Sequence, residues 1–429
     1  MPKRNNLPKK QYHMLTRRGF IRETGVGAAA VSAAMPQALT IGASAEDRLQ
    51  VAKQGVKIKI VTAEPLLVSY PGGGIWVLTR IRTDQGVDGI GEGFCESAES
   101  ARAVRAEILK IAPLLIGMDP LGINAFVQKF KHLEKGRFWT SAVAAMEIAM
   151  WDIAGKIAGK PIYDLLGGAL RTRIPVYQTW GATNLEEAIE KMAAAKARGV
   201  EMLKCDPFVT LPWRTVGVRI QDLPRPEDIK ATENYLARLR AVLGEDYKIG
   251  CDGHWRMSVE GAKRMAKAME PFKPVFFEEP TSLPNDPEDL KAVAASTSIP
   301  ISTGEHFETI EQAASALSSG AVSFIQPEVT WNCGILETIK MTSLAEGMGI
   351  RIATHGHVSS IGIRAASHIN AVIPNLFFQE HPGISWQEWN ETLFEPPDRV
   401  EAGHVVVSDA PGLGMKLNEA ELKKRQIDA

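Results

Sequence analysis

The chain has 429 residues, of which 45% are hydrophobic and 23% charged, and its formal net charge is −1. Because Lys and Arg are mixed with Asp and Glu throughout, the composition argues against a nucleic-acid partner and against a membrane partner. The length exceeds one typical domain and predicts two, with ample chain for a large core. The cysteines show no CxxC or zinc-ligand spacing and are predicted to be buried free thiols, at Cys95, Cys205, Cys251 and Cys333.

Residues 1–45 are expected to lie outside the fold. Arg17 and Arg18 precede a short apolar stretch at 25–34, and Ala43-Ser44-Ala45 supplies small residues for cleavage before Glu46. This order resembles a twin-arginine export signal and predicts a periplasmic protein. The apolar stretch is too short and too rich in Gly and Ala to span a bilayer.

Residues 56–173 are predicted to form an α+β domain. Strand patterns occur at 57–61, 74–81 and 86–93, and helical patterns follow at 100–115, 122–133 and 140–158. The Gly-rich turn at 69–74 is either a plain hairpin or a lid over a site. Tyr70 in this turn is a candidate substrate contact.

Residues 174–395 are predicted to form a (β/α)8 barrel, with strands beginning at 174–178 and 202–207 and ending at 376–380. Acidic residues and a histidine recur at separations of 26, 27, 23 and 27 residues, namely Asp252, Glu278, Glu305, Glu328 and His355. Each follows a short β-branched or aromatic run and precedes a helical pattern. They should therefore lie at the C-terminal ends of successive parallel strands, which form the catalytic face of such barrels.

Three acidic residues at consecutive strand ends repel one another unless a cation lies between them. Carboxylate ligands without Cys or His at the same level favour Mg2+ over Zn2+. Strand parity places Lys204 and Asp206 on one face, with Cys205 on the other, and it places Asp252 with His254. The long connection at 208–226 is expected to be functional, and residues 396–429 are expected to pack back on the first domain as a tail.

Several further motifs occur together in one order, at residues 86–92 (GVDGIGE), 141–156, 161–168, 277–280 (FEEP) and 411–414 (PGLG). They resemble the mandelate racemase and muconate lactonizing enzyme branch of the enolase superfamily, from about residue 56 to the tail. Within that branch, Asp252-Gly253-His254 and His355 are similar to acid-sugar dehydratases of the galactonate dehydratase type.

The resemblance implies a TIM-type barrel with an N-terminal α+β capping domain and a Mg2+ ion held by Asp252, Glu278 and Glu305. The choice of Glu278 over Glu279 rests on the resemblance, because parity does not distinguish them. The implied catalytic groups are His355 as base, Glu328 as its orienting carboxylate, His254 as acid and Lys204 as a positive charge near the substrate carboxylate. Candidate substrate contacts are Asp206, Glu380, Tyr70 and Trp331.

Alternatives remain for three of these groups. His357 is an alternative base, His254 an alternative structural hydrogen bonder, and Lys204 pairs alternatively with Asp206 or with a metal ligand. The chain also departs from the family pattern: Glu328 stands where an Asp is usual, and His306 where related dehydratases often carry Arg. These departures leave base geometry and pocket polarity open.

The implied function is a lyase, a Mg2+-dependent aldonate dehydratase that converts a small-molecule sugar acid into a 2-keto-3-deoxy acid. The alternatives are a racemase or epimerase of a 2-hydroxy acid at the same metal site, and a non-catalytic sugar-acid binding protein. A homo-oligomer is expected.

Overall fold

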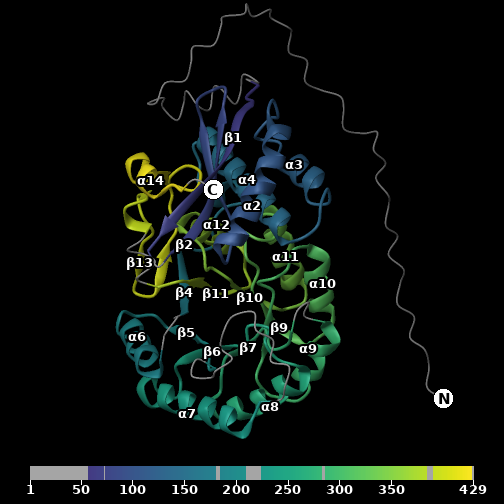
Figure 1. The fold of residues 1–429 in the computed structure, drawn as a ribbon, viewed down its shortest axis with the longest axis vertical. Coiled ribbons are helices and arrows are strands. Elements are labelled where there is room, and N and C mark those ends of the chain that lie inside the picture. Colours follow the sequence, from purple (N-terminus) through teal and green to yellow (C-terminus); the bar gives the residue numbers. More distant parts are fainter. Residues whose placement is uncertain are drawn as a thin grey trace, which may run out of the picture. The chain divides into compact units, whose positions relative to one another are not determined.

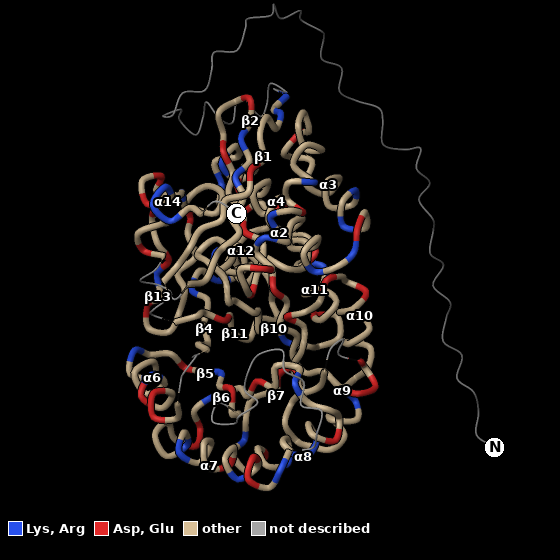
Figure 2. The backbone as a smooth tube through the Cα atoms, viewed as in Figure 1, with Lys and Arg blue, Asp and Glu red and all other residues tan. Residues whose placement is uncertain are grey.

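The computed structural model describes residues 57–71, 73–179, 184–208, 224–282, 286–383 and 390–427. The predicted export signal and most of the 208–226 connection lie outside these residues. Within them, no helix is both long enough and apolar enough to cross a membrane. Basic and acidic residues are interspersed along the outer helices (Figure 2), in agreement with the near-zero net charge.

The N-terminal part is an antiparallel sheet in the order β1 (Ile60–Tyr70), β2 (Gly74–Thr83), β3 (Asp88–Gly93), packed on α2 (Ala98–Leu115), α3 (Ile123–Phe130) and α4 (Arg137–Ala158) (Figure 1). Tyr70 pairs with Gly74, so the Gly-rich turn closes the β1–β2 hairpin. The first strand is longer than the predicted 57–61 and continues through Pro65. Proline is tolerated there because β1 is an edge strand.

Strand β3 rests directly on α4 because alternate positions on one face are glycine. A Cβ atom added at Gly91 would lie 1.9 Å from the carbonyl oxygen of Ala145, and one at Gly89 would lie 2.1 Å from that of Ala149. No other residue type leaves room for this approach. Side chains on a strand alternate between faces, so Glu92 points away from α4.

The second part is the predicted (β/α)8 barrel, which is confirmed. Its strands are all parallel and run in chain order, and β11 pairs with β4 to close the ring. They are β4 (Arg173–Thr179), β5 (Met202–Cys205), β6 (Lys248–Asp252), β7 (Phe276–Glu278), β8 (Ile301–Thr303), β9 (Val322–Ile325), β10 (Arg351–Thr354) and β11 (Leu376–His381). The helices between them are α6 (Leu185–Ala197), α7 (Pro226–Leu243), α8 (Val259–Met269), α9 (Pro287–Ala294), α10 (Ile310–Ser318), α11 (Ile335–Gly347) and α12 (Ser360–Val372).

Aromatic side chains fill the barrel interior at its base, including Tyr177, Phe276 and Phe324, while a larger apolar layer separates the strands from the helices. Cys205 and Cys251 are register partners on β5 and β6 and lie in that outer layer, with their sulfur atoms 4.0 Å apart. All four cysteines are free, as predicted; three are buried, whereas Cys95 is half-buried. Cys205 therefore faces the helices, on the side of β5 that strand parity predicted.

The C-terminal residues return to both parts. Strand β14 (His404–Val406) pairs antiparallel with β4, and the helix α14 (Glu419–Arg425) lies against β1. Glu419 forms an ion pair with Arg80 at 2.6 Å, and the amide of Ile427 donates to the carbonyl of Leu67 at 3.0 Å. The domain limits expected from the sequence, 56–173, 174–395 and 396–429, remain our proposed division.

Candidate active site at the barrel mouth

The predicted acidic residues lie at neighbouring strand ends. Asp252 and Glu278 are the last residues of β6 and β7 and are register partners. Glu305 and Glu328 follow the ends of β8 and β9, and His355 directly follows β10. All five side chains are buried. The even spacing in the sequence thus corresponds to one compact group.

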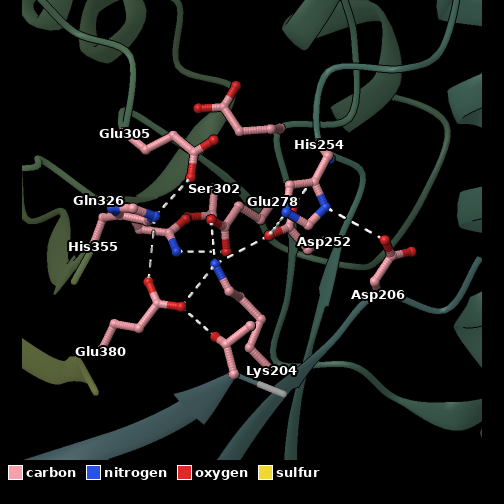
Figure 3. Close-up of polar contacts among 12 residues, drawn as sticks. Lys204, Asp206, Asp252, His254, Glu278, Ser302, Glu305, Gln326, His355 and Glu380 are labelled. Carbon is pink, nitrogen blue, oxygen red and sulfur yellow. Dashed lines mark hydrogen bonds and ion pairs between the residues drawn. The ribbon is translucent and has the colours of Figure 1, made fainter. Parts of the chain in front are cut away.

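Lys204 lies inside this group. Its Nζ atom is 2.8 Å from Glu278 Oε1, 3.0 Å from Asp252 Oδ2 and 3.2 Å from Glu380 Oε1 (Figure 3). Burial alone would lower the pKa of Lys204, but these three carboxylates raise it well above its ordinary value. Lys204 therefore pairs with two predicted metal ligands and does not pair with Asp206. It supplies one positive charge to a cluster of several negative ones.

The carboxylates of the cluster perturb one another. Burial, together with the charge of Asp252, raises the pKa of Glu278 to about 8. Burial also raises the pKa of Glu305 well above its ordinary range, and Asp252, Glu278 and Glu279 add to this effect although His355 opposes it. Such crowding of buried carboxylates is costly unless a cation neutralises it.

The donor set fits a hard divalent cation, which prefers carboxylate oxygens. Asp252, Glu278 and Glu305 would hold it. The structure does not bring the ligand atoms of these three residues within 4.8 Å of one another. Among the described residues, the group that meets this distance is Glu279, Glu305 and His306. Glu305 thus belongs to both sets. Glu279 already accepts hydrogen bonds from Thr303 Oγ1 and from the amide of Gly304, whereas Glu278 faces Lys204.

His355 is paired with a carboxylate. Its Nδ1 atom lies 2.8 Å from Glu328 Oε2, and its Nε2 atom lies 3.3 Å from Glu305 Oε2. Burial alone would lower the pKa of His355, but the carboxylates of Glu380, Glu305 and Glu328 raise it to about 10. His357 lines the same cavity and is exposed. Of these two histidines, His355 is the one with the arrangement expected of an oriented base.

His254 adopts an unusual backbone conformation, with φ +47°. Its amide donates to Asp252 Oδ1 at 2.8 Å, and its Nε2 atom lies 3.3 Å from Asp252 Oδ2. Its Nδ1 atom lies 3.6 Å from Asp206 Oδ2, which also forms an ion pair with Arg256 NH1 at 2.9 Å. Burial lowers the pKa of His254. His254 is therefore held between two carboxylates and beside a buried guanidinium.

Sequence reasoning missed three polar residues of this site. Gln326 donates to Glu278 Oε2 at 2.6 Å, Arg256 pairs with Asp206, and Glu92 reaches the site from β3. Residues 252, 254 and 256 alternate in sequence, as do 326 and 328. Extending the strand alternation past the strand end would therefore have predicted that Arg256 and Gln326 face the site. Nothing local in the sequence indicates the partners of Glu92.

A cavity of about 380 Å³ opens at the barrel mouth and is lined from both domains. Its lining includes the four candidate substrate contacts, Tyr70, Asp206, Trp331 and Glu380. Trp331 is 2% exposed, and its indole N–H has no hydrogen-bond partner among the described residues. A buried unpaired donor is costly, so this one is available to a polar ligand. Phe94 stacks on Trp331 with ring centroids 4.6 Å apart.

The fold and the site together define a class: a capped (β/α)8 barrel with an acidic centre and a carboxylate-paired histidine at the C-terminal ends of its strands. Residues 65–167 match the mandelate racemase / muconate lactonizing enzyme N-terminal domain, and residues 186–421 match the enolase C-terminal domain-like family. The chain belongs to this family, the mandelate racemase and muconate lactonizing enzyme branch of the enolase superfamily.

Individual relatives agree with this. The chain is 32% identical over 365 residues to a D-galactonate dehydratase of Ralstonia nicotianae, covering 82% of this chain and 92% of that one. A mandelate racemase/muconate lactonizing enzyme-like protein of Rubrobacter xylanophilus has a similar structure, with a TM-score of 0.80, 26% identity and coverage of 87% and 98%. A mandelate racemase/muconate lactonizing enzyme of Jannaschia sp. gives a TM-score of 0.78, 29% identity and coverage of 86% and 98%.

Proposed function

We propose that this protein is a Mg2+-dependent acid-sugar dehydratase, a hydro-lyase that converts an aldonate into a 2-keto-3-deoxy acid. The observation that carries the proposal is His355, paired through Nδ1 with Glu328 and placed with Nε2 beside the carboxylate cluster. The similarity to D-galactonate dehydratases over 82% of the chain supports the substrate class.

A bound Mg2+ would stabilise the negative charge that develops on the substrate carboxylate when the neighbouring carbon loses its proton. Asp252, Glu278 and Glu305 would hold the ion. Lys204, 2% exposed and surrounded by carboxylates, keeps the cluster from carrying its full negative charge.

Proton transfers fall to the two histidines. As a neutral imidazole, His355 would take the α-proton at Nε2. The carboxylates of Glu305 and Glu380 beside Nε2 raise the pKa of His355, and a cation on that cluster would offset their charge, while Glu328 accepts the Nδ1 hydrogen. The C–O bond at the β-carbon then breaks, and His254 donates the proton with which the hydroxyl leaves as water. The enol that remains tautomerises to the 2-keto acid, so atoms and charge balance without an oxidant.

The arrangement of the histidines favours a second candidate, racemisation or epimerisation of a 2-hydroxy acid. His254 and His355 lie on opposite sides of the carboxylate cluster (Figure 3). Two bases on opposite faces of one α-carbon can remove and return a proton with inversion. The dehydratase is preferred because the carboxylates of Asp252 and Asp206 lie beside His254 and favour its protonated form, opposing the burial and the Arg256 charge that lower its pKa.

The test is incubation of the purified protein and Mg2+ with a library of acid sugars that includes D-galactonate. A 2-keto product that disappears with His355→Asn supports the dehydratase. Deuterium uptake at the α-carbon without a keto product indicates a racemase or epimerase. Ligand-induced thermal stabilisation alone would show a binding protein and refute both catalytic proposals.

A further inference from the structure

We propose that Glu92, on the last strand of the capping domain, is a positioning residue for the pair of His355 and Glu328. The capping domain would then take part in proton abstraction as well as covering the barrel. The inference rests on the proposed function of that pair as the base.

The sequence around Glu92 directs its side chain at the barrel. Glycines at 89 and 91 press one face of β3 onto the backbone of α4, at the separations given above. The strand is therefore fixed on a rigid helix, and Glu92 extends from its opposite face. Glu92 is 2% exposed.

Glu92 binds the start of helix α12. Its Oε1 atom accepts from the amide of Ser359 at 2.8 Å, and its Oε2 atom accepts from Ser359 Oγ at 2.6 Å and from the amide of Gly362 at 2.9 Å. Ser359 is the N-cap of α12, where a carboxylate is favoured by the free amides and by the helix dipole. The short loop that begins with His355 ends at Ser359, so Glu92 fixes its far end.

Phe94, two residues after Glu92, contacts the loop that carries Glu328. Its amide donates to the carbonyl of Thr330 at 3.1 Å, and its ring stacks on Trp331 and lies edge-on to His355 at 5.9 Å between centroids. Thr330 in turn donates to Glu328 Oε1 through its amide and its hydroxyl. One strand end thus contacts both loops that carry the base and its orienting carboxylate.

This placement bears on catalysis because a base must lie within about 2.6–3.2 Å of the proton that it removes. A displacement of about 1 Å costs roughly 10²-fold in rate. A loop carrying His355 without an anchor at Ser359 has the freedom to make such a displacement.

The chain offers a matched control in Glu147 on α4. Its Oε2 atom accepts from the amide of Ile335 at 2.8 Å, and its Oε1 atom accepts from the amide of Leu336 at 2.9 Å and from Trp151 Nε1 at 2.7 Å. It is likewise a buried carboxylate that reaches from the capping domain to the start of a barrel helix, α11. Its contact at Ile335 lies seven residues beyond Glu328, whereas Ser359 lies four residues beyond His355, so Glu147 constrains the catalytic pair less directly. Unlike Glu92, it does not line the cavity.

The experiment compares Glu92→Gln with Glu147→Gln. Each oxygen of both carboxylates accepts a hydrogen bond from a backbone amide. In either orientation of the new side-chain amide, its NH2 group therefore faces a backbone N–H, and each substitution disturbs the start of one helix, α12 or α11. We expect Glu92→Gln to lower kcat and α-proton exchange by roughly 10- to 10²-fold with KM nearly unchanged, and Glu147→Gln to leave both rates within about threefold. Both variants are assayed where near-ultraviolet circular dichroism shows them folded.

Hydrogen exchange tests the same inference without turnover. The amides of residues 355–358 lie outside the hydrogen bonds of Glu92, and we expect them to exchange faster in Glu92→Gln but not in Glu147→Gln. If the wild type turns over no acid sugar, the proposed function fails and this measurement still decides the inference. Unchanged protection at 355–358, equal losses of kcat in the two variants, or a raised KM with an unchanged kcat would overturn it.

Discussion

Replacing Glu328 by Gln tests the base most directly, because the amide changes one oxygen into a donor. Glu328 Oε1 accepts from the amide of Thr330 at 3.0 Å and from its hydroxyl at 2.8 Å, while Oε2 lies 2.8 Å from His355 Nδ1. If the new NH2 faces His355, Nδ1 must become the acceptor. The imidazole hydrogen then resides on Nε2, the atom that must take the substrate proton.

The opposite amide orientation also has a cost. The NH2 would face the amide of Thr330, and a buried donor left without an acceptor costs about 1–3 kcal/mol, or roughly 10- to 10²-fold in the competent population. Holding a catalytic histidine in the wrong tautomer has cost about 10⁴-fold elsewhere. We therefore expect Glu328→Gln to slow α-proton exchange by 10² to 10⁴-fold.

The assay is exchange of the α-proton into deuterated water, followed by mass spectrometry, on the acid sugar that the library identifies. Glu328→Asp is the control that keeps the charge, and we expect it to retain more exchange than Glu328→Gln. An exchange rate of Glu328→Gln within about threefold of the wild type would refute the tautomer argument.

Four further outcomes are expected. Asp252→Asn should abolish both turnover and calorimetric Mg2+ binding while the fold persists; full activity in metal-free protein would contradict this. Gly91→Ala should lower the free energy of unfolding by about 1–3 kcal/mol, since its Cβ meets the Ala145 oxygen; an unchanged denaturation midpoint would count against the close packing. Burial raises the pKa of Glu147 to about 8. The stability that its protonated form gives the folded state is therefore complete below the pKa of the unfolded chain, near 4.5, and is lost as pH rises towards 8. The stability of the wild type relative to Glu147→Gln should thus fall by on the order of 5 kcal/mol across that range, and a flat difference would contradict it. Mass spectrometry of periplasmic protein should find an N-terminus near Glu46 and four alkylated cysteines; a cytosolic protein that still carries Met1, or any disulfide, would refute the expected export route.

The barrel and its acidic face could be predicted because βα units repeat at nearly constant length and alternation decides which side chains point inward. Lys204 shows the limit of alternation as a predictor. Strand parity gave the face on which its side chain lies, but parity alone did not identify the three carboxylates that it contacts. The roles of Glu278 and Glu279 separate only where the backbone turns, at a φ of +42° for Glu279. A local conformation of this kind leaves no periodic signal.

Contacts between distant segments were beyond prediction for a different reason. Gln326 directly follows β9 and Glu278 ends β7, with a whole βα unit between them, and Glu92 meets Ser359 across 267 residues. The first pairing depends on how strand ends converge in the closed barrel and the second on how two domains dock, and a single sequence encodes neither in a local pattern. The first strand was placed too early because Glu64 and Pro65 interrupt the apolar alternation, whereas its hydrogen bonds to β2 continue to Tyr70.

The antiparallel pairing of β14 with β4 has a consequence for biosynthesis. Strand β4 is the first strand of the barrel, yet two of its partners are made last. Residues 176–178 pair with β11, and residues 173–175 pair with β14 near residue 405. Such pairings close loops of more than two hundred residues, which makes folding slow. While the ribosome still holds the last part of the chain, the barrel has an open edge, and a nascent chain with exposed strand edges is a substrate for chaperones. The barrel is therefore expected to close only after residues 376–406, which contain these two partners of β4, have been synthesised.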